Sequence, residues 1–513
     1  MKIFNGGLGY AWLETLAREF EETFKDVSFE DGKKGVYISI TPNKQFDDLH
    51  SNISVGAETD DIFYTATRDI YNFTDLGVAY DVTDIMTADV YDTDGMVQLN
   101  EDKTGWKTQE KSIHDRINVA HHRDTFNLGT EEEPSYYSLP FEDSCAGIIL
   151  DWDLIKAEGW DSLYDGIDGM PATISDFYDL LTRIRRKGWS SFIYSTAVGY
   201  YTPAIQRAVI AQVEGSETYY DLFKDYTADY DFNGDGTIEE MEKITPNTAY
   251  KILDTKGYQS AVEMGLKLFE KDSSGKTYYD PSVTQGLSFG AAQQDFLMSK
   301  NTETPIAMIF EGEWWENEAR GTFNAMGALN EDDAYGKREF RMMPMPSFDS
   351  TNENQKYTLG SFSSGYLTLV NQNTVGENSV KQKLAELWLQ YQYSAEGLKC
   401  FTKHTGEILP VEFEMTAEDL NELTPFARNL YNLKRDPRVE VVYGGSTMET
   451  EEIYRASQKV GFYTNISSTN YTGSLFNNLV SLILANKSVT AAEYIAGMHT
   501  YYDDKIQSAF PIQ

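Results

Sequence analysis

The residues best suited to chemistry form a twelve-residue acidic loop at positions 231–242, with the sequence DFNGDGTIEEME. Oxygen-bearing side chains stand at its first, third and fifth positions, a glycine at the sixth and a carboxylate at the twelfth, which is the pattern of an EF-hand calcium loop. Roughly six or seven hard oxygen ligands converge in such a loop, a set that Ca²⁺ prefers and Zn²⁺ does not. We therefore expect a bound Ca²⁺ with the following ligands: Asp231, Asn233, Asp235, the carbonyl of Thr237, Glu242, and Glu239 through a water.

The sequence offers no second loop to pair with this one. The nearest stretch, which contains Asp92 and Glu101, has Val90 where the first calcium ligand would stand. A single loop inside a large domain is more typical of a structural clamp than of a calcium sensor. The alternative is an acidic surface turn that matches the pattern without binding a metal.

No signature of catalysis accompanies the loop. The six histidines form no HExxH pattern, and there is no GxSxG, no phosphate-binding loop and no dinucleotide fingerprint. Cys145 and Cys400 are the only cysteines and lack the spacing of a metal site, so we expect two ordinary thiols. A glycosidase pair of carboxylates stays open among the 81 Asp and Glu residues. We expect a protein that is not an enzyme.

Several aromatic side chains stand beside turns rather than inside apolar runs. Such rings can pack on the C–H faces of sugars, although core packing is the commoner explanation for any single ring. Trp314 and Trp315 are adjacent, so in an extended strand their side chains would point to opposite faces. One could then face a ligand while the other packs in the core. The aromatic residues of interest are Tyr10, Tyr64, Tyr200, Tyr201, Trp314, Trp315 and Tyr471.

The elements that position these residues belong to a large acidic chain. Its 513 residues correspond to about two or three packed units, and its 41% hydrophobic residues can supply large cores. A formal charge of −38 disfavours nucleic acid and anionic membrane surfaces as partners. No run approaches the ~20 apolar residues of a membrane span, and the first residues lack a signal-peptide pattern. The protein is therefore either cytoplasmic or a chain whose targeting segment has been removed.

Strands and helices alternate along the sequence. Apolar residues recur at helical spacing from Leu13 to Phe24, directly after a glycine turn. Thr173 and Asp176 predict the capped start of another helix, which we expect to end at Gly188. The alternation predicts an α/β protein, and the lack of a long linker predicts interwoven units. The expected strands lie at residues 2–4, 36–40, 62–64 and 147–150.

Eight segments follow one another in a recognisable order along the chain. They are NGGLGYAWLETLAREF (5–20), DIFYTATR (61–68), YSLPFEDSCAGIILDWDL (137–154), PATISDFYDLLTRIRRKG (171–188), MIFEGEWW (308–315), GSFSSGYLTLV (360–370), TGEILPV (405–411) and the helical close from residue 473. In the order and spacing of these segments, the chain resembles the extracellular solute-binding proteins of bacterial ABC importers, in the carbohydrate-binding group that includes maltose-binding protein. The resemblance spans nearly the whole chain.

The resemblance implies an α/β fold of two lobes joined by hinge crossovers, with the ligand in a cleft between the lobes. Lobe 1 would comprise residues 1–138 and 358–410, and lobe 2 residues 139–357 and 411–513. The chain is longer than most of the family, and we expect the excess as a helical insertion around 195–300 that carries the calcium loop. The crossings are expected near 137–142, 357–366 and 405–415.

The resemblance also implies which residues contact the ligand. Tyr10 matches the turn after the first strand, and Tyr64 and Arg68 match contacts on the first lobe. Trp314 matches a tryptophan platform on the second lobe, with Trp315 pointing into that lobe. The candidate ligand-binding residues are Tyr10, Tyr64, Arg68, Glu142, Asp143, Trp314, Trp315 and Tyr471.

The function implied by the resemblance is capture of an oligosaccharide outside the cell and its delivery to the permease subunits of an ABC importer by lobe closure. Gly7 and Leu8 stand where maltose-binding protein has charged residues, and Thr67 replaces an acid, which argues against maltose itself. We expect a lipid-anchored monomer whose signal segment has been removed. The alternatives are a binding protein of the same fold for a peptide or polyamine, and a calcium-dependent glycoside hydrolase.

Overall fold

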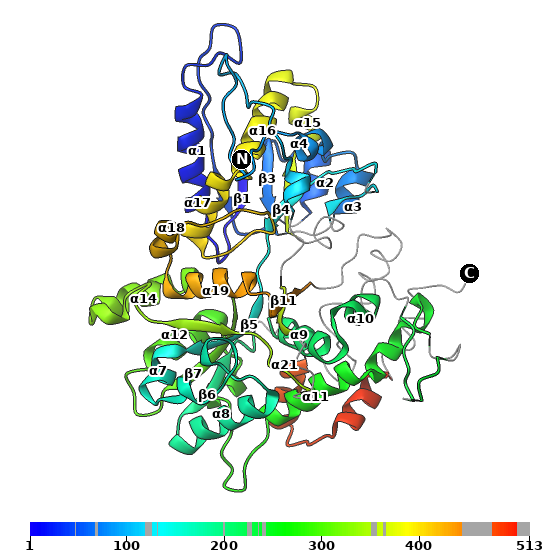
Figure 1. Ribbon diagram of the computed structural model, residues 1–513, viewed down its shortest axis with the longest axis vertical. Helices are drawn as coiled ribbons and strands as arrows, with labels where there is room; N and C mark the ends of the chain where they lie inside the picture. Colours follow the sequence, from blue (N-terminus) through cyan, green and yellow to red (C-terminus); the bar gives the residue numbers. More distant parts are fainter. Residues whose placement is uncertain are drawn as a thin grey trace. The chain divides into compact units, whose positions relative to one another are not determined.

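In the computed structural model, which describes most of the chain, the protein folds into two compact units (Figure 1). Unit 1 comprises Met1–Ser144 and Ser363–Arg428, and unit 2 comprises Cys145–Phe362 and Asn429–Gln513. Each unit is therefore assembled from two separate stretches of chain. The described residues are 1–46, 48–66, 70–117, 126–130, 132–197, 201–222, 228–233, 235–238, 243–349, 356–362, 366–443 and 475–499.

Unit 1 is built on a five-stranded mixed sheet. β1 (Lys2–Phe4) lies between β2 (Thr41–Asn43) and β3 (Ile62–Thr65) and is parallel to both. β10 (Tyr366–Val370) pairs antiparallel with β3 and with β4 (Leu139–Glu142). The second stretch of unit 1 thus supplies an inner strand of the sheet that the first stretch begins.

The first helix of unit 1 forms because its apolar residues fall on one face. α1 (Ala11–Thr23) buries Leu13, Leu16 and Phe20, and Phe24 is buried directly after it, as the sequence predicted. α1 packs against α16 and α17. The remaining helices of unit 1 are α2 (Leu49–Ser54), α3 (Ile70–Asp75), α4 (Thr83–Thr87), α5 (Ile113–Arg116), α15 (Gln372–Val375), α16 (Ser379–Gln392), α17 (Ala395–Thr405) and α18 (Ala417–Glu422), with α19 (Pro425–Arg435) starting in unit 1 and ending in unit 2.

Unit 2 is built on a four-stranded sheet. β5 (Ala146–Asp151) lies between β7 (Ile306–Gly312) and β8 (Phe340–Met343) and is antiparallel to both, while β6 (Ser190–Tyr194) is parallel to β7. Every residue of β5 and β7 is buried, which explains their continuous apolar runs. A separate parallel pair joins β9 (Tyr357–Gly360) to β11 (Val439–Val442).

Helices pack against this sheet, among them α7, α8, α9 and α12 (Figure 1). None of the helices in the described residues is long and apolar enough to cross a membrane. The helices and 3₁₀ turns of unit 2 are α7 (Trp152–Ala157), η1 (Trp160–Ser162), η2 (Ile167–Gly169), α8 (Ile174–Lys187), α9 (Thr202–Glu214), α10 (Ser216–Tyr220), η5 (Pro246–Asp254), α11 (Lys256–Leu268), η6 (Pro281–Gln285), α12 (Phe289–Ser299), α13 (Trp315–Glu318), α14 (Arg320–Gly327), η7 (Glu331–Asp333) and α21 (Leu475–Leu484).

α8 shows how local sequence signals set a helix. The Thr173 side chain accepts from the Asp176 backbone N–H, and the Asp176 carboxylate accepts from the Thr173 backbone N–H, which completes a capping box. Gly188 ends the helix with φ of 89°, a left-handed conformation that glycine adopts without steric cost. Both predicted ends of this helix are confirmed.

The strand expected at residues 36–40 is wrong, since the first strand after α1 is β2 at Thr41–Asn43. Neighbouring side chains do alternate between the interior and the surface here, because Ile38 is buried and Tyr37 is exposed. However, the Ile38 carbonyl accepts from Arg18 (2.7 Å), and the Ile38 N–H donates to Glu21 (2.7 Å). Side chains of α1 thus take the backbone groups that a strand partner would need.

The unit boundaries also differ from the expected lobes. They lie after Ser144, Phe362 and Arg428, where the sequence analysis set 138, 357 and 410. The third difference has a clear cause, because α18 is joined to α17 by ion pairs. Lys399 and Lys403 of α17 lie 3.0 Å and 2.7 Å from Asp419 of α18. Residues 411–428 therefore belong to unit 1.

Candidate ligand-binding site

The end of β7 carries the tryptophan pair of unit 2. The strand stops at Gly312, Glu313 and Trp314 form the turn, and α13 begins at Trp315. The segment is therefore not extended through both tryptophans, and the argument from strand alternation does not apply to it. The turn separates the two rings instead.

Trp315 lies in the interior of unit 2. Its side chain is fully buried and contacts Phe340 edge-on, with ring centroids 4.9 Å apart, as well as Phe296 and Phe323. This placement agrees with the prediction that Trp315 points into its own lobe. It also corrects the inclusion of Trp315 among the ligand-binding candidates, because an enclosed ring offers no face to a ligand.

Trp314 belongs to an aromatic cluster at the same end of β7. Its ring centroid lies 5.2 Å from that of Tyr201 and 4.9 Å from that of Phe362. Only 6% of Trp314 is exposed, so the expectation of a partly packed platform is wrong for this structure. The cluster still brings together three aromatic rings, from Tyr201 at the N-cap of α9, Trp314 in the turn after β7, and Phe362 after β9.

Glu313, the neighbour of Trp314, is held by two donors. Its carboxylate accepts from the Cys145 N–H (2.9 Å) and pairs with Lys434 of α19 (2.8 Å). The Glu313 N–H in turn donates to the Cys145 carbonyl (3.0 Å). A buried carboxylate is stable only when its charge is compensated in this way. Glu313 thus fixes the turn of β7 against the start of β5.

Glu311 lies one step earlier and has a different environment. Complete burial and the nearby Glu318 raise the pKa of Glu311 well above its usual range. Burial also raises the pKa of Glu318. The Gln293 amide donates to Glu318 (2.7 Å) and more weakly to Glu311 (3.5 Å). Burial beside a second acid therefore favours the protonated form of Glu311.

In unit 1, Glu142 is the last residue of β4, Asp143 follows it, and both are buried. The Ser144 hydroxyl donates to Glu142 (2.9 Å) and also to Glu407. The Asp143 N–H donates to Glu407 (2.6 Å). These bonds join the segment after β4 to the segment after α17. Glu142 and Asp143 therefore help to shape the backbone here, whatever contacts they make with a ligand.

Tyr64 has a core role in this structure. It is fully buried, its hydroxyl donates to Gln392 (2.5 Å), and it accepts from the Trp388 indole (2.7 Å). Its ring also meets Trp12 edge-on. With its ring enclosed and its hydroxyl engaged, Tyr64 is corrected from ligand contact to core residue. Tyr10 is half-buried and stands at the N-cap of α1, in the turn where the sequence analysis placed it.

Three predicted site residues, Arg68, Tyr471 and Glu242, lie outside the described residues, as do Glu239 and the aromatic Tyr200. The described part of the acidic loop has the geometry of the first half of an EF-hand. Asp231 accepts from the Gly236 N–H (2.7 Å) and the Asp235 N–H (3.2 Å). Gly236 has φ of 82°, as the sixth position requires, and its left-handed backbone explains the glycine there.

The base of the acidic loop is closed by an antiparallel bridge. Asp229 pairs with Lys243, and the Ile244 N–H donates to the Ala228 carbonyl (2.8 Å). Ile238, the apolar eighth position, is 40% exposed. In the described stretches of the loop, therefore, nothing covers this side chain as a paired second hand would.

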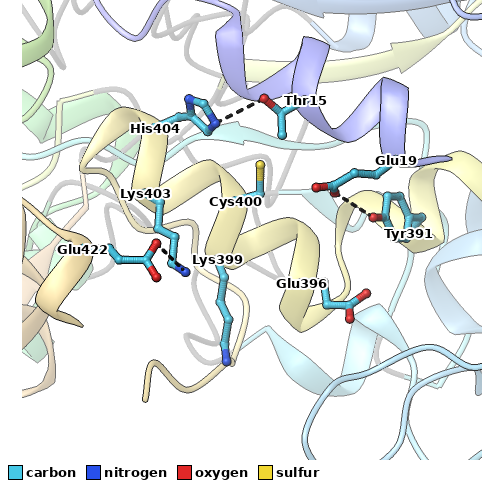
Figure 2. Close-up of a pocket in the computed structure, with 9 residues that line it drawn as sticks. All are labelled: Thr15, Glu19, Tyr391, Glu396, Lys399, Cys400, Lys403, His404 and Glu422. Carbon is cyan, nitrogen blue, oxygen red and sulfur yellow. Dashed lines mark hydrogen bonds and ion pairs between the residues drawn. The ribbon is translucent and has the colours of Figure 1, made fainter. Parts of the chain in front are cut away.

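A polar groove of about 580 Å³ lies on unit 1 between α1, α17 and α18 (Figure 2). Thr15 and Glu19 of α1 face His404 and Tyr391, to which they are joined by hydrogen bonds of 3.3 Å and 3.0 Å. Burial and the Glu19 carboxylate raise the pKa of the Cys400 thiol to about 12. The thiol is therefore protonated at neutral pH and is a poor nucleophile or metal ligand.

Known proteins were compared with this chain in sequence and in structure. No protein-family model matches the sequence, and no curated protein matches it in sequence. Solved structures match over almost the whole chain at 12% identity. They are the solute-binding protein RafE in complex with raffinose (99% of both chains, TM-score 0.53), the apo form of RafE from Streptococcus pneumoniae (99% and 97%, TM-score 0.55) and a chitin oligosaccharide binding protein (98% and 96%, TM-score 0.54).

The likeness establishes the fold. This chain has the two-unit α/β fold of the solute-binding proteins, as the resemblance in its sequence predicted.

Some residues of these clusters were not among the candidates. Phe362, Glu311 and Glu407 stand inside the segments that carry the resemblance, but nothing in their types singled them out. No sequence pattern could point to Lys434, because its ion-pair partner Glu313 is 121 residues away. Only the folded chain brings these residues together.

Proposed function

We propose that this chain is the sugar-binding component of a bacterial ABC importer and that it captures an oligosaccharide without altering it. The observation that carries the proposal is the full-length likeness of fold to proteins that bind raffinose and chitin oligosaccharide. The aromatic cluster of Tyr201, Trp314 and Phe362 supports it, because such rings suit the C–H faces of sugars.

The proposal includes a role for Trp314 as the stacking ring and for Tyr10, Glu142 and Asp143 as polar contacts. Because Trp314 is almost enclosed by its neighbours, a ligand would reach its ring only after the side chains that cover the ring move aside. Arg68 and Tyr471 stay in the proposed set on the resemblance alone.

The test is a glycan-array screen followed by isothermal titration of the sugars that bind. Raffinose and chitin oligosaccharides are the first probes, with spermidine and a tripeptide as representatives of the non-sugar alternatives. Binding of a sugar without cleavage would support the proposal. Binding of spermidine or the peptide alone would favour the same-fold alternative, and release of shorter sugars would favour the hydrolase.

We also propose a structural Ca²⁺ in the acidic loop. The loop geometry supports the proposal, because Asp231 accepts from the backbone N–H groups of Asp235 and Gly236, and Asn233 accepts from that of Asp235, beside the positive-φ glycine. Among the described residues no group of three or more His, Cys, Asp and Glu side chains is arranged to hold a metal. Calcium binding at this loop therefore depends on Glu242, the expected bidentate ligand, together with the Thr237 carbonyl.

Calcium should act as a stabilising ligand, because an ion that binds only the folded state shifts the unfolding equilibrium. EDTA should lower the melting temperature, and Ca²⁺ should restore it. Glu242→Gln should remove this sensitivity, whereas Glu303→Gln, an exposed acid of the same unit, should keep it. An unchanged melting curve in EDTA, with no metal found by elemental analysis, would contradict the site.

The location and partners follow from the proposed function. We propose that the protein works as a monomer on the outer side of the membrane, held by a lipid anchor, and that it delivers its ligand to permease subunits. The charge of −38 is consistent with a partner other than nucleic acid. Co-purification with the permease in detergent, dependent on the sugar, would test the partnership.

A further inference from the structure

The indole of Trp314 folds back over the end of its own strand. A Cβ built at Gly312 would stand 2.1 Å from Cη2 of the ring and 2.3 Å from Cζ2 and Cζ3, whereas ordinary contact begins at 3.4 Å. The φ of Gly312 is not positive, so its backbone would accept an alanine. Glycine is therefore required here by the position of the ring and not by the backbone.

The polar edge of the same indole is held by Glu311. The indole N–H is the only strong hydrogen-bonding group of a tryptophan side chain, so the side-chain hydrogen bond between Trp314 and Glu311 joins that N–H to the carboxyl. The Glu311 carboxyl also accepts from the Gly312 N–H (3.1 Å) and, more weakly, from Gln293 of α12 (3.5 Å). Glu311 thus holds the indole from a fully buried strand.

These contacts act on one ring from several directions. Gly312 admits the benzo part of the indole, Glu311 holds its N–H, and Tyr201 and Phe362 pack around it. All the residues lie in unit 2, so the arrangement belongs to one compact unit of the chain. A ring that is held in this way has a single orientation before any ligand arrives.

We propose that Glu311 and Gly312 are positioning residues that hold Trp314 in the orientation needed to stack on a sugar ring. The inference rests on the proposed function of the chain and adds the residues that prepare its stacking ring. A surface that is ordered in advance loses less conformational entropy on binding, which raises affinity without a new contact. Neither Glu311 nor Gly312 touches the ligand, because both act through the indole.

The first test is Gly312→Ala, titrated with the tightest-binding oligosaccharide of the array screen. The added methyl group must displace the ring by about 1.3 Å to reach the ordinary contact distance. We expect a Kd at least roughly tenfold higher. Gly321→Ala is the matched control, since it lies in the same unit and its added Cβ would meet nothing within 4 Å. Its Kd should stay within about twofold.

The second test separates the hydrogen bond from packing. Glu311→Gln keeps an oxygen that accepts the indole N–H and should bind nearly as wild type does. Glu311→Leu has a similar size but no acceptor and should bind as weakly as Gly312→Ala. A merely structural role would move the melting temperature of Glu311→Leu without moving the Kd. This pair keeps the inference testable even where Gly312→Ala fails to fold.

A spectroscopic reading needs no ligand. Among the 8 tryptophans labelled with 5-fluorotryptophan, the ¹⁹F signal of Trp314 is assigned by its loss in Trp314→Phe. In Gly312→Ala this signal alone should shift or broaden. If wild type binds a sugar and Gly312→Ala binds it equally well, the inference is wrong while the proposed function stands. If no sugar binds wild type, both fail.

Discussion

The aromatic core of unit 2 predicts a large and local effect of Trp315→Ala. Trp315 is fully buried, and its ring contacts Phe340, Phe296 and Phe323 at centroid distances of 4.9, 5.8 and 5.9 Å. Truncation of a buried tryptophan removes both its transfer free energy and its packing contacts. We expect the free energy of unfolding to fall by about 3–5 kcal/mol. Because all the contacts lie in unit 2, the loss should appear in the unfolding step of that unit.

The assay is urea denaturation followed by circular dichroism, with a sugar titration at low denaturant. Trp189→Ala is the control, because Trp189 is half-buried in the same unit and should cost about 1 kcal/mol, the centre of the range for point mutations. Trp315→Ala should keep the Kd of wild type. A loss of stability no larger than that of the control would refute the packing argument, and lost binding in a stable Trp315→Ala would return this residue to the ligand site.

Four further outcomes follow from the structure. Trp314→Ala should weaken sugar binding by about 1–3 kcal/mol, on the scale of base stacking on aromatic rings. It should also lower the free energy of unfolding, because the ring is almost buried. A variant that binds the sugar as tightly as wild type in titration would contradict the stacking role. Burial alone would raise the pKa of Asp419, but hydrogen bonds from Lys403, the Thr416 backbone and Lys399 hold this pKa well below its usual range. The Asp419 carboxylate therefore contributes fully to the free energy of unfolding above pH ~4, and this contribution is lost progressively as the pH falls below that value. Asp419→Asn should therefore cost about 1 kcal/mol at pH 7 and less near pH 2, as denaturation at both pH values will show. Asp151→Ala should lower the free energy of unfolding by about 3–5 kcal/mol, because it leaves the fully buried Arg338 without its carboxylate partner. The double variant with Asp151→Leu and Arg338→Met should recover most of this stability. A single variant as stable as wild type would contradict a stabilising role of this ion pair. Small-angle scattering should give a smaller radius of gyration with the sugar bound, as hinge closure requires, and an unchanged radius at saturation would argue against closure.

Local signals in the sequence were enough to predict the elements whose ends are set by neighbouring residues. The capping box of Thr173 and Asp176 and the terminal Gly188 gave both ends of α8, and the apolar spacing from Leu13 gave α1. The strand at 36–40 failed because alternation reports burial and not hydrogen bonding. The backbone groups of Ile38 are bonded to side chains of α1, which no spacing rule could foresee.

The candidate site was less predictable, because its partners are distant in sequence. Tyr64 looked like a surface aromatic beside a turn, yet its hydroxyl is bonded to Trp388, 324 residues away. The turn at Gly312 could not be read from a motif that looks extended, so the tryptophan pair was placed by the wrong geometry. The acidic loop depends on no distant partner, since all its expected ligands lie within twelve residues, and its calcium ion stays a prediction.

The most direct test of the proposed function is isothermal titration with sugars, followed by recovery of the bound ligand. The protein should bind an oligosaccharide with a saturable one-to-one heat signal, and mass spectrometry should recover that sugar intact after hours of incubation. No binding by any sugar of the array, or recovery of shorter sugars than were added, would contradict the assignment of this chain as a non-enzymatic sugar-binding protein.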